Sequence, residues 1–112
     1  MRAMLGTGSI VIVHLVNPTE KLWGLLEALD ATGVVLRGIN LSSFDDWMLQ
    51  ARREGAPSLG LATTFVPMFR VERIFLDEQV GEVESYRQRF ERSVGLTVEE
   101  FLGLERDSEV PS

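Results

Sequence analysis

The stretch from Leu22 to Leu41 constrains the fold more than any other part of the chain. Two apolar runs are separated by the short link Asp30-Ala31-Thr32-Gly33, in which the glycine is able to take a positive φ. Such a link between two apolar runs predicts a β-hairpin. Gly24 lies inside the first run, where a glycine usually marks a bulge or a bend that curls a sheet toward closure. The stretch therefore predicts the beginning of a small β-barrel.

Alternating and β-branched segments predict five strands in all. They are expected at 9–16, 21–29, 33–41, 61–69 and 71–77. The first strand is apolar on both faces, which is typical of a strand that is covered on both sides. Between the third and fourth strands the apolar period becomes helical, and Ser43 as N-cap with Gly55 as the stop predicts a helix over 44–54. Phe44 and Trp47 are expected to anchor this helix onto the barrel.

The C-terminal part of the chain is predicted to be helical. Helical spacing begins at Val83 and ends at Gly95. Thr97 with Glu100 has the spacing of a capping box, so a second helix is expected to run to about Leu104. The domain organisation predicted from these elements is a flexible lead-in at 1–8, a barrel at 9–78, a helical extension at 79–104 and a disordered tail at 105–112.

The same patterns predict which side chains form the core. The expected core residues of the barrel are apolar side chains spaced along the strands: Val11, Val13, Leu15, Leu25, Leu29, Val35, Phe65 and Phe75. Three residues of the helical extension are expected to pack over part of the barrel: Val83, Tyr86 and Phe90.

Composition excludes several classes of protein. The 112 residues include no cysteine and one histidine, so disulfides, thiolate catalysis, cysteine zinc sites and paired-histidine metal sites are excluded. The histidine, His14, lies in the middle of a predicted strand, where packing on a sheet face explains it better than catalysis. No apolar run approaches the ~20 residues that cross a bilayer, and the first residues do not resemble a signal peptide. We expect a cytoplasmic protein with no membrane partner and no cofactor.

Charged clusters are each explained without catalysis. The acidic run through Asp77, Glu78, Glu82 and Glu84 lacks the alternation and the glycine turn of a metal-binding loop. The pair Asp45-Asp46 suits the first turn of a helix. Since no nucleophile–base pair is evident, we expect the protein not to be an enzyme.

Two short motifs resemble those of the Sm-like (LSm) family. Gly24, Leu26 and Asp30 have the glycine, leucine and aspartate spacing of the family's first motif, with Leu29 before the aspartate. The segment Phe69-Arg70-Val71-Glu72-Arg73-Ile74 matches the second motif except that Val71 stands where the family has glycine. Over residues 10–77 the chain resembles a divergent bacterial-type member of this family.

The resemblance implies a fold and a candidate ligand. The fold would be mainly β with added helices, namely a five-stranded Sm-like (SH3-type) small barrel with one helix between strands 3 and 4 and helices at the C-terminus. Family members that bind oligouridine use an asparagine where this chain has Val34, together with the arginine that Arg70 matches. The candidate RNA-binding residues are Arg70, Arg73, Asp30 and Arg37. As the alternative, Arg70 and Arg73 form surface ion pairs with the nearby Glu72 or Asp77.

The resemblance also implies assembly. Sm-like proteins join subunits through the fourth and fifth strands, and unpaired strand edges are templates for pairing. A homo-oligomer is therefore expected, with candidate interface residues Phe65, Val66, Ile74 and Phe75. Two functions stay open: a scaffold or assembly module without a nucleic-acid role, or a ring that binds RNA atypically through Arg70. The net charge of −6 disfavours RNA as a partner.

Overall fold

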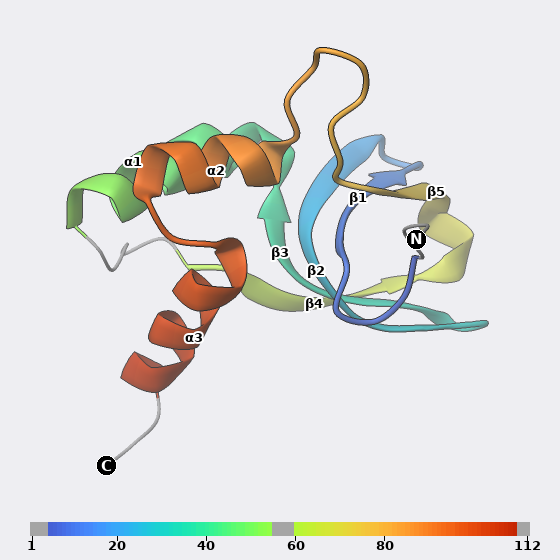
Figure 1. The fold of residues 1–112 in the computed structure, drawn as a ribbon. Helices are drawn as coiled ribbons and strands as arrows, with labels where there is room; N and C mark the ends of the chain where they lie inside the picture. Colours follow the sequence, from blue (N-terminus) through green and yellow to red (C-terminus); the bar gives the residue numbers. More distant parts are fainter. Residues whose placement is uncertain (1–4, 55–59, 110–112) are drawn as a thin grey trace. The chain divides into compact units, whose positions relative to one another are not determined.

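A computed structural model of the chain describes residues 5–54 and 60–109 (Figure 1). In chain order its elements are β1 (Ile10–Leu15), β2 (Glu20–Asp30), β3 (Gly33–Asn40), η1 (Leu41–Ser43), α1 (Phe44–Glu54), β4 (Ala62–Pro67), η2 (Met68–Arg70), β5 (Val71–Leu76), α2 (Tyr86–Val94) and α3 (Val98–Glu109). Internal contacts divide the chain into two compact units. The sheet unit comprises Met1–Phe44 with Leu61–Asp77, and the helical unit comprises Asp45–Gly60 with Glu78–Ser112.

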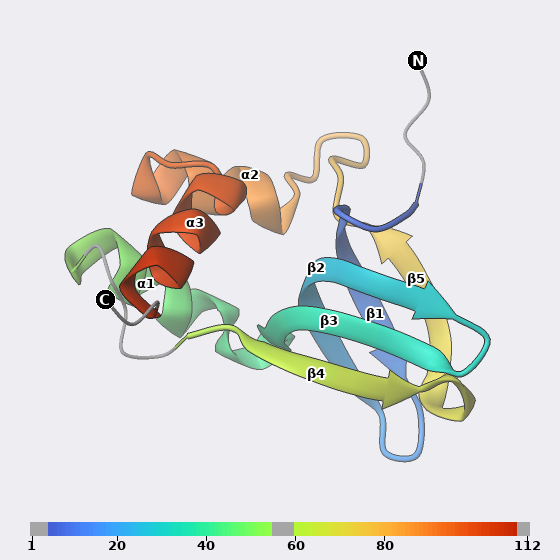
Figure 2. The same ribbon diagram turned by 90° about the horizontal axis from the view of Figure 1, so that it is seen from below.

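The five strands form one antiparallel sheet in the order β4-β3-β2-β1-β5 (Figure 2). The predicted mainly-β class, the five strands, the helix after the third strand and the C-terminal helices are confirmed. The sheet does not close into a barrel, because in the described part of the chain no ladder joins β4 to β5. The short η2 connects these strands, and its two ends are tied to different hairpins: Met68 N donates to Thr32 O, and Val16 N donates to Arg70 O.

The inner face of the bent sheet carries the core of the sheet unit. The buried side chains that form it are Val11, Val13, Leu15, Leu26, Val34, Leu36 and Val66. The predicted burial of the three β1 residues is confirmed. Prediction was wrong for Leu29, Phe65 and Phe75, which are exposed, while Leu25 and Val35 are only partly buried.

A shift of one residue explains most of these errors. Successive strand side chains point to opposite faces, so an error of one position moves the whole predicted set to the wrong face. In β3 the inward positions are Val34 and Leu36 and not Val35. In β2 the inward position is Leu26 and not Leu25, whereas Leu29 lies opposite the inward Val34 but remains 41% exposed.

The outer face of β1 is also covered, as its pattern predicts. Ile10 and Ile12 are buried there. Trp23 of β2 is fully buried and donates its indole N–H to Asp77 Oδ2 at 2.9 Å, beyond the end of β5. Phe44 packs edge-on against the Trp23 ring, with centroids 4.9 Å apart. These contacts account for apolar residues on both faces of the first strand.

The β2–β3 hairpin forms where it was predicted, with Asp30 opposite Gly33. Its glycine serves a different purpose, however, because Gly33 does not adopt a positive φ. A Cβ on Gly33 would collide with the carbonyl oxygen of Val66 and with the ring of Phe65. Gly33 is therefore required by the close approach of β4 and not by the turn.

In the helical unit α1 spans the predicted residues, but its beginning differs. Ser43 belongs to η1, whose N-cap is Asn40, and Asn40 Oδ1 accepts from Ser42 N at 3.0 Å. The predicted stop at Gly55 lies outside the described residues. Trp47 of α1 stacks on Phe90 of α2 with ring centroids 4.7 Å apart, a contact within the helical unit.

Helices α2 and α3 confirm two predicted helix ends. Gly95 ends α2 in the left-handed region with φ 88°. Thr97 and Glu100 form the capping box, with hydrogen bonds of 3.0 Å and 2.9 Å. Helix α2 begins at Tyr86 and has a capping box at its N-terminus. Val83, where helical spacing was expected to begin, precedes the helix and is exposed. Phe90 is fully buried, as predicted.

The two ends of the described chain carry structure beyond the predicted elements. Helix α3 continues to Glu109, past its predicted end near Leu104, and 110–112 lie outside the described residues. In the predicted lead-in, Gly8 N donates to Leu26 O at 2.8 Å, while residues 1–4 lie outside the description. None of the described helices is both long and apolar enough to cross a membrane.

Candidate functional site

Arg70, the leading RNA candidate, is engaged within the sheet unit. Its guanidinium donates to Val16 O at 3.1 Å and to Pro18 O at 2.7 Å, and it pairs with Glu20 Oε1 at 2.8 Å. These three partners belong to the β1–β2 turn and to the first residue of β2. Arg70 therefore fastens η2 to that turn, and its ion-pair partner is neither Glu72 nor Asp77.

Asp30 and Arg37, two further RNA candidates, lie in different settings. Asp30 Oδ1 accepts from Thr32 N at 2.8 Å and from Thr32 Oγ1 at 2.6 Å, which shapes the β2–β3 turn. These hydrogen bonds lower the pKa of the Asp30 carboxyl, because they stabilise its charged form. Arg37 is buried in β3, opposite Leu25 of β2.

Arg73 is the most accessible of the three candidate arginines. Its side chain is 65% exposed, and its Nε lies 4.0 Å from Glu72 Oε1. This distance agrees with the expected surface pair with Glu72, although exposed ion pairs contribute little to stability. On the neighbouring strand β1, His14 is its direct partner.

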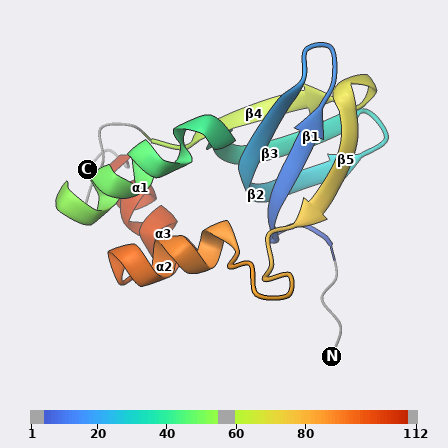
Figure 3. The ribbon, with the colours of Figure 1, turned by 90° about the horizontal axis from the view of Figure 1, so that it is seen from above.

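The four candidate interface residues divide into two kinds. Phe65 of β4 is 55% exposed, and Phe75 of β5 is also exposed. Val66 is buried in the core of the sheet unit, and the half-buried Ile74 packs against that core. Phe69 in η2 is 83% exposed, although the sequence analysis did not select it. Exposed aromatic rings therefore lie on or next to both edge strands, which form the two opposite edges of the sheet (Figure 3).

A groove lies where β2 begins and β3 ends. It has a volume of about 460 Å³, and its lining residues are Thr19, Glu20, Lys21, Asn40, Leu41 and Ser42. The Glu20 carboxylate in this lining is paired with Arg70. The Asn40 oxygen accepts from both Ser42 N and Ser42 Oγ, so the far wall of the groove is held by local hydrogen bonds.

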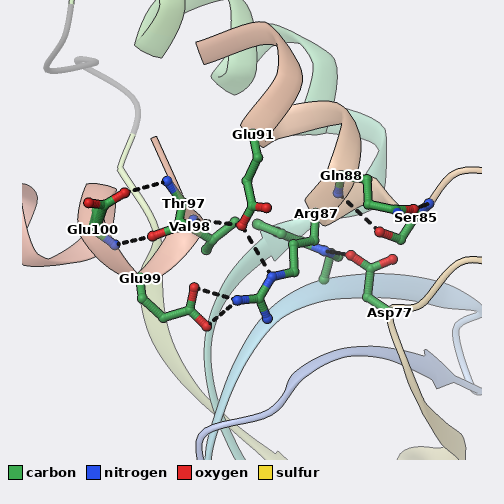
Figure 4. Close-up of polar contacts among 10 residues, drawn as sticks. Asp77, Ser85, Arg87, Gln88, Glu91, Thr97, Val98, Glu99 and Glu100 are labelled. Carbon is green, nitrogen blue, oxygen red and sulfur yellow. Dashed lines mark hydrogen bonds and ion pairs between the residues drawn. The ribbon is translucent and has the colours of Figure 1, made fainter. Parts of the chain in front are cut away.

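The charged side chains of the helical unit form ion pairs that join its helices. Arg87 of α2 contacts Glu91 at 3.2 Å and makes two bonds of 2.6 Å to the carboxylate of Glu99 in α3 (Figure 4). Arg89 pairs with Asp45 of α1 at 2.6 Å. Glu91 also accepts from Val98 N at 3.4 Å. These pairs join α2 to α1 and to α3 within the helical unit.

Glu84 from the acidic run pairs with Arg92, at 2.7 Å. The hydrogen bond from Arg92 lowers the pKa of the Glu84 carboxyl. Among the side chains that the structure describes, no three acidic or histidine groups converge in a way that could hold a metal ion. Comparison of the chain with family models, with curated proteins and with solved structures finds no match.

Sequence reasoning missed the partners of the arginines and the groove. No local pattern pairs Pro18 or Glu20 with Arg70, which lies 52 and 50 residues further along the chain. His14 lies beside Arg73 because β1 pairs with β5 in this register. A correct prediction of the register would have placed these two residues together.

Proposed function

We propose that this chain is a non-enzymatic assembly module of Sm-like type, whose subunits associate by pairing edge strand β4 of one copy with edge strand β5 of the next. The observation that carries the proposal is the open sheet, whose two outer strands have no partner strand on one side in the described chain. An edge strand presents unpaired N–H and C=O groups, which favour pairing with another chain.

The exposed aromatic residues support the same proposal. Phe65 and Phe69 place apolar rings at β4 and in the η2 that follows it, and Phe75 does so on β5. Burying a large apolar side chain stabilises an association by about 1.5–3 kcal/mol. Because two different edges would meet, the contact is head-to-tail, and it forms a closed ring if the rotation between subunits allows closure.

The setting of the candidate RNA residues favours this proposal over the RNA alternative. Arg70 contacts two backbone carbonyls and a carboxylate, so its Nε and Nη2 donate within the subunit. Val34, at the position of the base-binding asparagine, is fully buried and has no polar side-chain atom. A net charge of −6 per subunit adds repulsion toward a phosphate backbone.

Sedimentation velocity of the full chain at micromolar concentration tests the proposal. We expect a mass that is a multiple of the 12.6 kDa subunit. Phe65→Lys should lower that mass, because a charged side chain at a strand edge opposes pairing. Phe69→Lys should act in the same direction from outside the strands, so the test does not depend on one folded variant.

Leu49→Lys is the matched control, since Leu49 is a similarly exposed apolar residue (43%) on α1 of the helical unit. It introduces the same charge on a helix of the helical unit and not on a strand, and it should leave the mass unchanged. A parent protein that sediments as a monomer would refute the proposal. Equal effects of Phe65→Lys and Leu49→Lys would assign association to general surface charge.

A further inference from the structure

Three nitrogen-bearing side chains form a row across three adjacent strands of the sheet unit. His14 of β1 is the direct partner of Lys21 in β2 and of Arg73 in β5. Directly paired residues share one face of a sheet, and neighbouring strands lie about 4.8 Å apart. The row therefore places two cations about 10 Å apart at the backbone, with an imidazole ring between them.

The local electrostatics of the row differ from those of the whole chain. Although the net charge is −6, the groups acting on His14 are Lys21 from β2 with Arg73 and Glu72 from β5. Partial burial lowers the pKa of His14 most, the charges of Lys21 and Arg73 lower it further, and Glu72 acts in the opposite direction. The imidazole is thus mainly neutral at pH 7, in a field set by two cations.

We propose that Lys21, His14 and Arg73 form a binding site for the phosphate group of a small phosphorylated ligand. The guanidinium provides a planar fork of donors, the ammonium a compact charge, and the imidazole an additional N–H donor or, when protonated, a third charge. Glu72, at 4.0 Å from Arg73, is the carboxylate that a phosphate would displace from the guanidinium.

The groove gives the remainder of the ligand a place. Lys21 also lines this groove, so the phosphate site adjoins a volume of about 460 Å³, within the usual range for small-molecule sites. Thr19 and Ser42 contribute hydroxyl groups to its lining. The pairing of Glu20 with Arg70 neutralises the one carboxylate in the lining.

The overall charge favours a small ligand over a nucleic acid. A compact anion interacts with the row alone, whereas an extended chain of phosphates would also interact with the rest of an acidic surface. The inference does not rest on the proposed assembly, because the three side chains lie in one subunit.

NMR titration of the imidazole resonances tests the proposal directly, since His14 is the only histidine. The probes are inorganic pyrophosphate, uridine 5′-monophosphate and hexauridylate, each added to the full chain near 0.15 M salt. A phosphate bound between the cations should raise the His14 pKa by about one unit, because a nearby negative charge favours the protonated ring. The shift should saturate with pyrophosphate and with the monophosphate.

Two variants and one control locate the site. Arg73→Gln and Lys21→Gln should each weaken the binding of both small probes about tenfold, since each removes one charge-assisted contact. Arg52→Gln removes the same charge from α1 of the helical unit and should leave binding unchanged. Thermal melting of each variant verifies that it folds.

Three results would overturn the proposal. The first is the absence of a saturable change at His14 with either small probe up to about 10 mM, where even weak phosphate sites fill. The second is binding that neither sheet-unit variant weakens. The third is a response to hexauridylate alone, which would define a nucleic-acid surface in place of a small-ligand site.

Discussion

Gly24 of β2 and Gly38 of β3 are direct partners in the antiparallel pairing, and neither position has room for a side chain. A Cβ on Gly24 would collide with the carbonyl oxygen of Arg37 and with the Cα of Gly38. A Cβ on Gly38 would collide with the carbonyl oxygen of Trp23. The two glycines therefore let β2 and β3 approach closely at the centre of the sheet.

Gly24→Ala should lower the free energy of unfolding by about 1–3 kcal/mol, the usual cost of overpacking, and Gly24→Val by more. The obstructing atoms belong to the backbone and cannot rotate away. Urea denaturation measures the change.

Gly103→Ala in α3 is the control, because nothing lies within 4 Å of its added methyl group. The control should stabilise the protein by about 0.5–1 kcal/mol, as alanine does in a helix. Equal effects at both positions would contradict the close approach.

Arg70→Ala should destabilise the sheet unit by about 1.5–3 kcal/mol, the range for hydrogen bonds that involve a charged group. The variant leaves the carbonyls of Val16 and Pro18 and the Glu20 carboxylate without this donor. Glu20→Gln should have a smaller effect, since both carbonyl contacts remain. If Arg70→Ala unfolded at the same urea concentration as the parent, the assignment of Arg70 to the β1–β2 turn would be wrong.

The local parts of the fold could be predicted because their signals are local. The capping box of Thr97 and Glu100 and the stop at Gly95 depend on residues a few positions apart, and both are confirmed. The inward positions of β2 and β3 depend on the phase of an alternation that a bulge interrupts. Prediction selected Leu25 and Val35, whereas their neighbours Leu26 and Val34 are the buried residues.

The candidate site was less predictable, because its contacts join residues distant in sequence. Arg70 was selected as an RNA candidate, and its partners lie in the β1–β2 turn and at the first residue of β2. Likewise, the closed barrel was inferred from the bend at Gly24, while closure depends on whether β4 reaches β5. No residue of the sequence reports that distance.

Phe90→Ala should destabilise the helical unit by about 3–5 kcal/mol, the cost of removing a buried aromatic ring. Phe90 is fully buried between Trp47 and Phe101, with ring centroids at 4.7 Å and 5.4 Å. The tryptophan fluorescence of the folded protein should change with it, because Trp47 loses its stacking partner. Leu49→Ala on the exposed side of α1 is the control and should change stability little. An unaltered melting temperature for Phe90→Ala would refute this packing.

Hexauridylate should bind the parent protein more weakly than about 10 μM near physiological salt, within the non-specific range. Val34 has no group that could hydrogen-bond a uracil edge, and the charge of −6 opposes the phosphates. Fluorescence anisotropy with a labelled strand measures the affinity. Tight, salt-resistant binding that Arg70→Ala abolishes would restore the RNA function and contradict the assembly module.

His14→Gln should make the protein less sensitive to mild acid than the parent. Burial, Lys21 and Arg73 lower the pKa of folded His14 below its ordinary value of 6.5, so the unfolded chain binds a proton more readily than the folded one. Stability is therefore highest above that value and falls as the pH drops through it toward the folded pKa. Glutamine does not titrate, so the variant lacks this loss. Carboxyl groups with lowered pKa, such as Asp30, titrate in both proteins, and their contributions cancel in the difference. Urea midpoints between pH 7.5 and 5 should fall more steeply for the parent than for the variant. Parallel pH profiles for the two proteins would show that burial and the charges of Lys21 and Arg73 do not lower the pKa of His14.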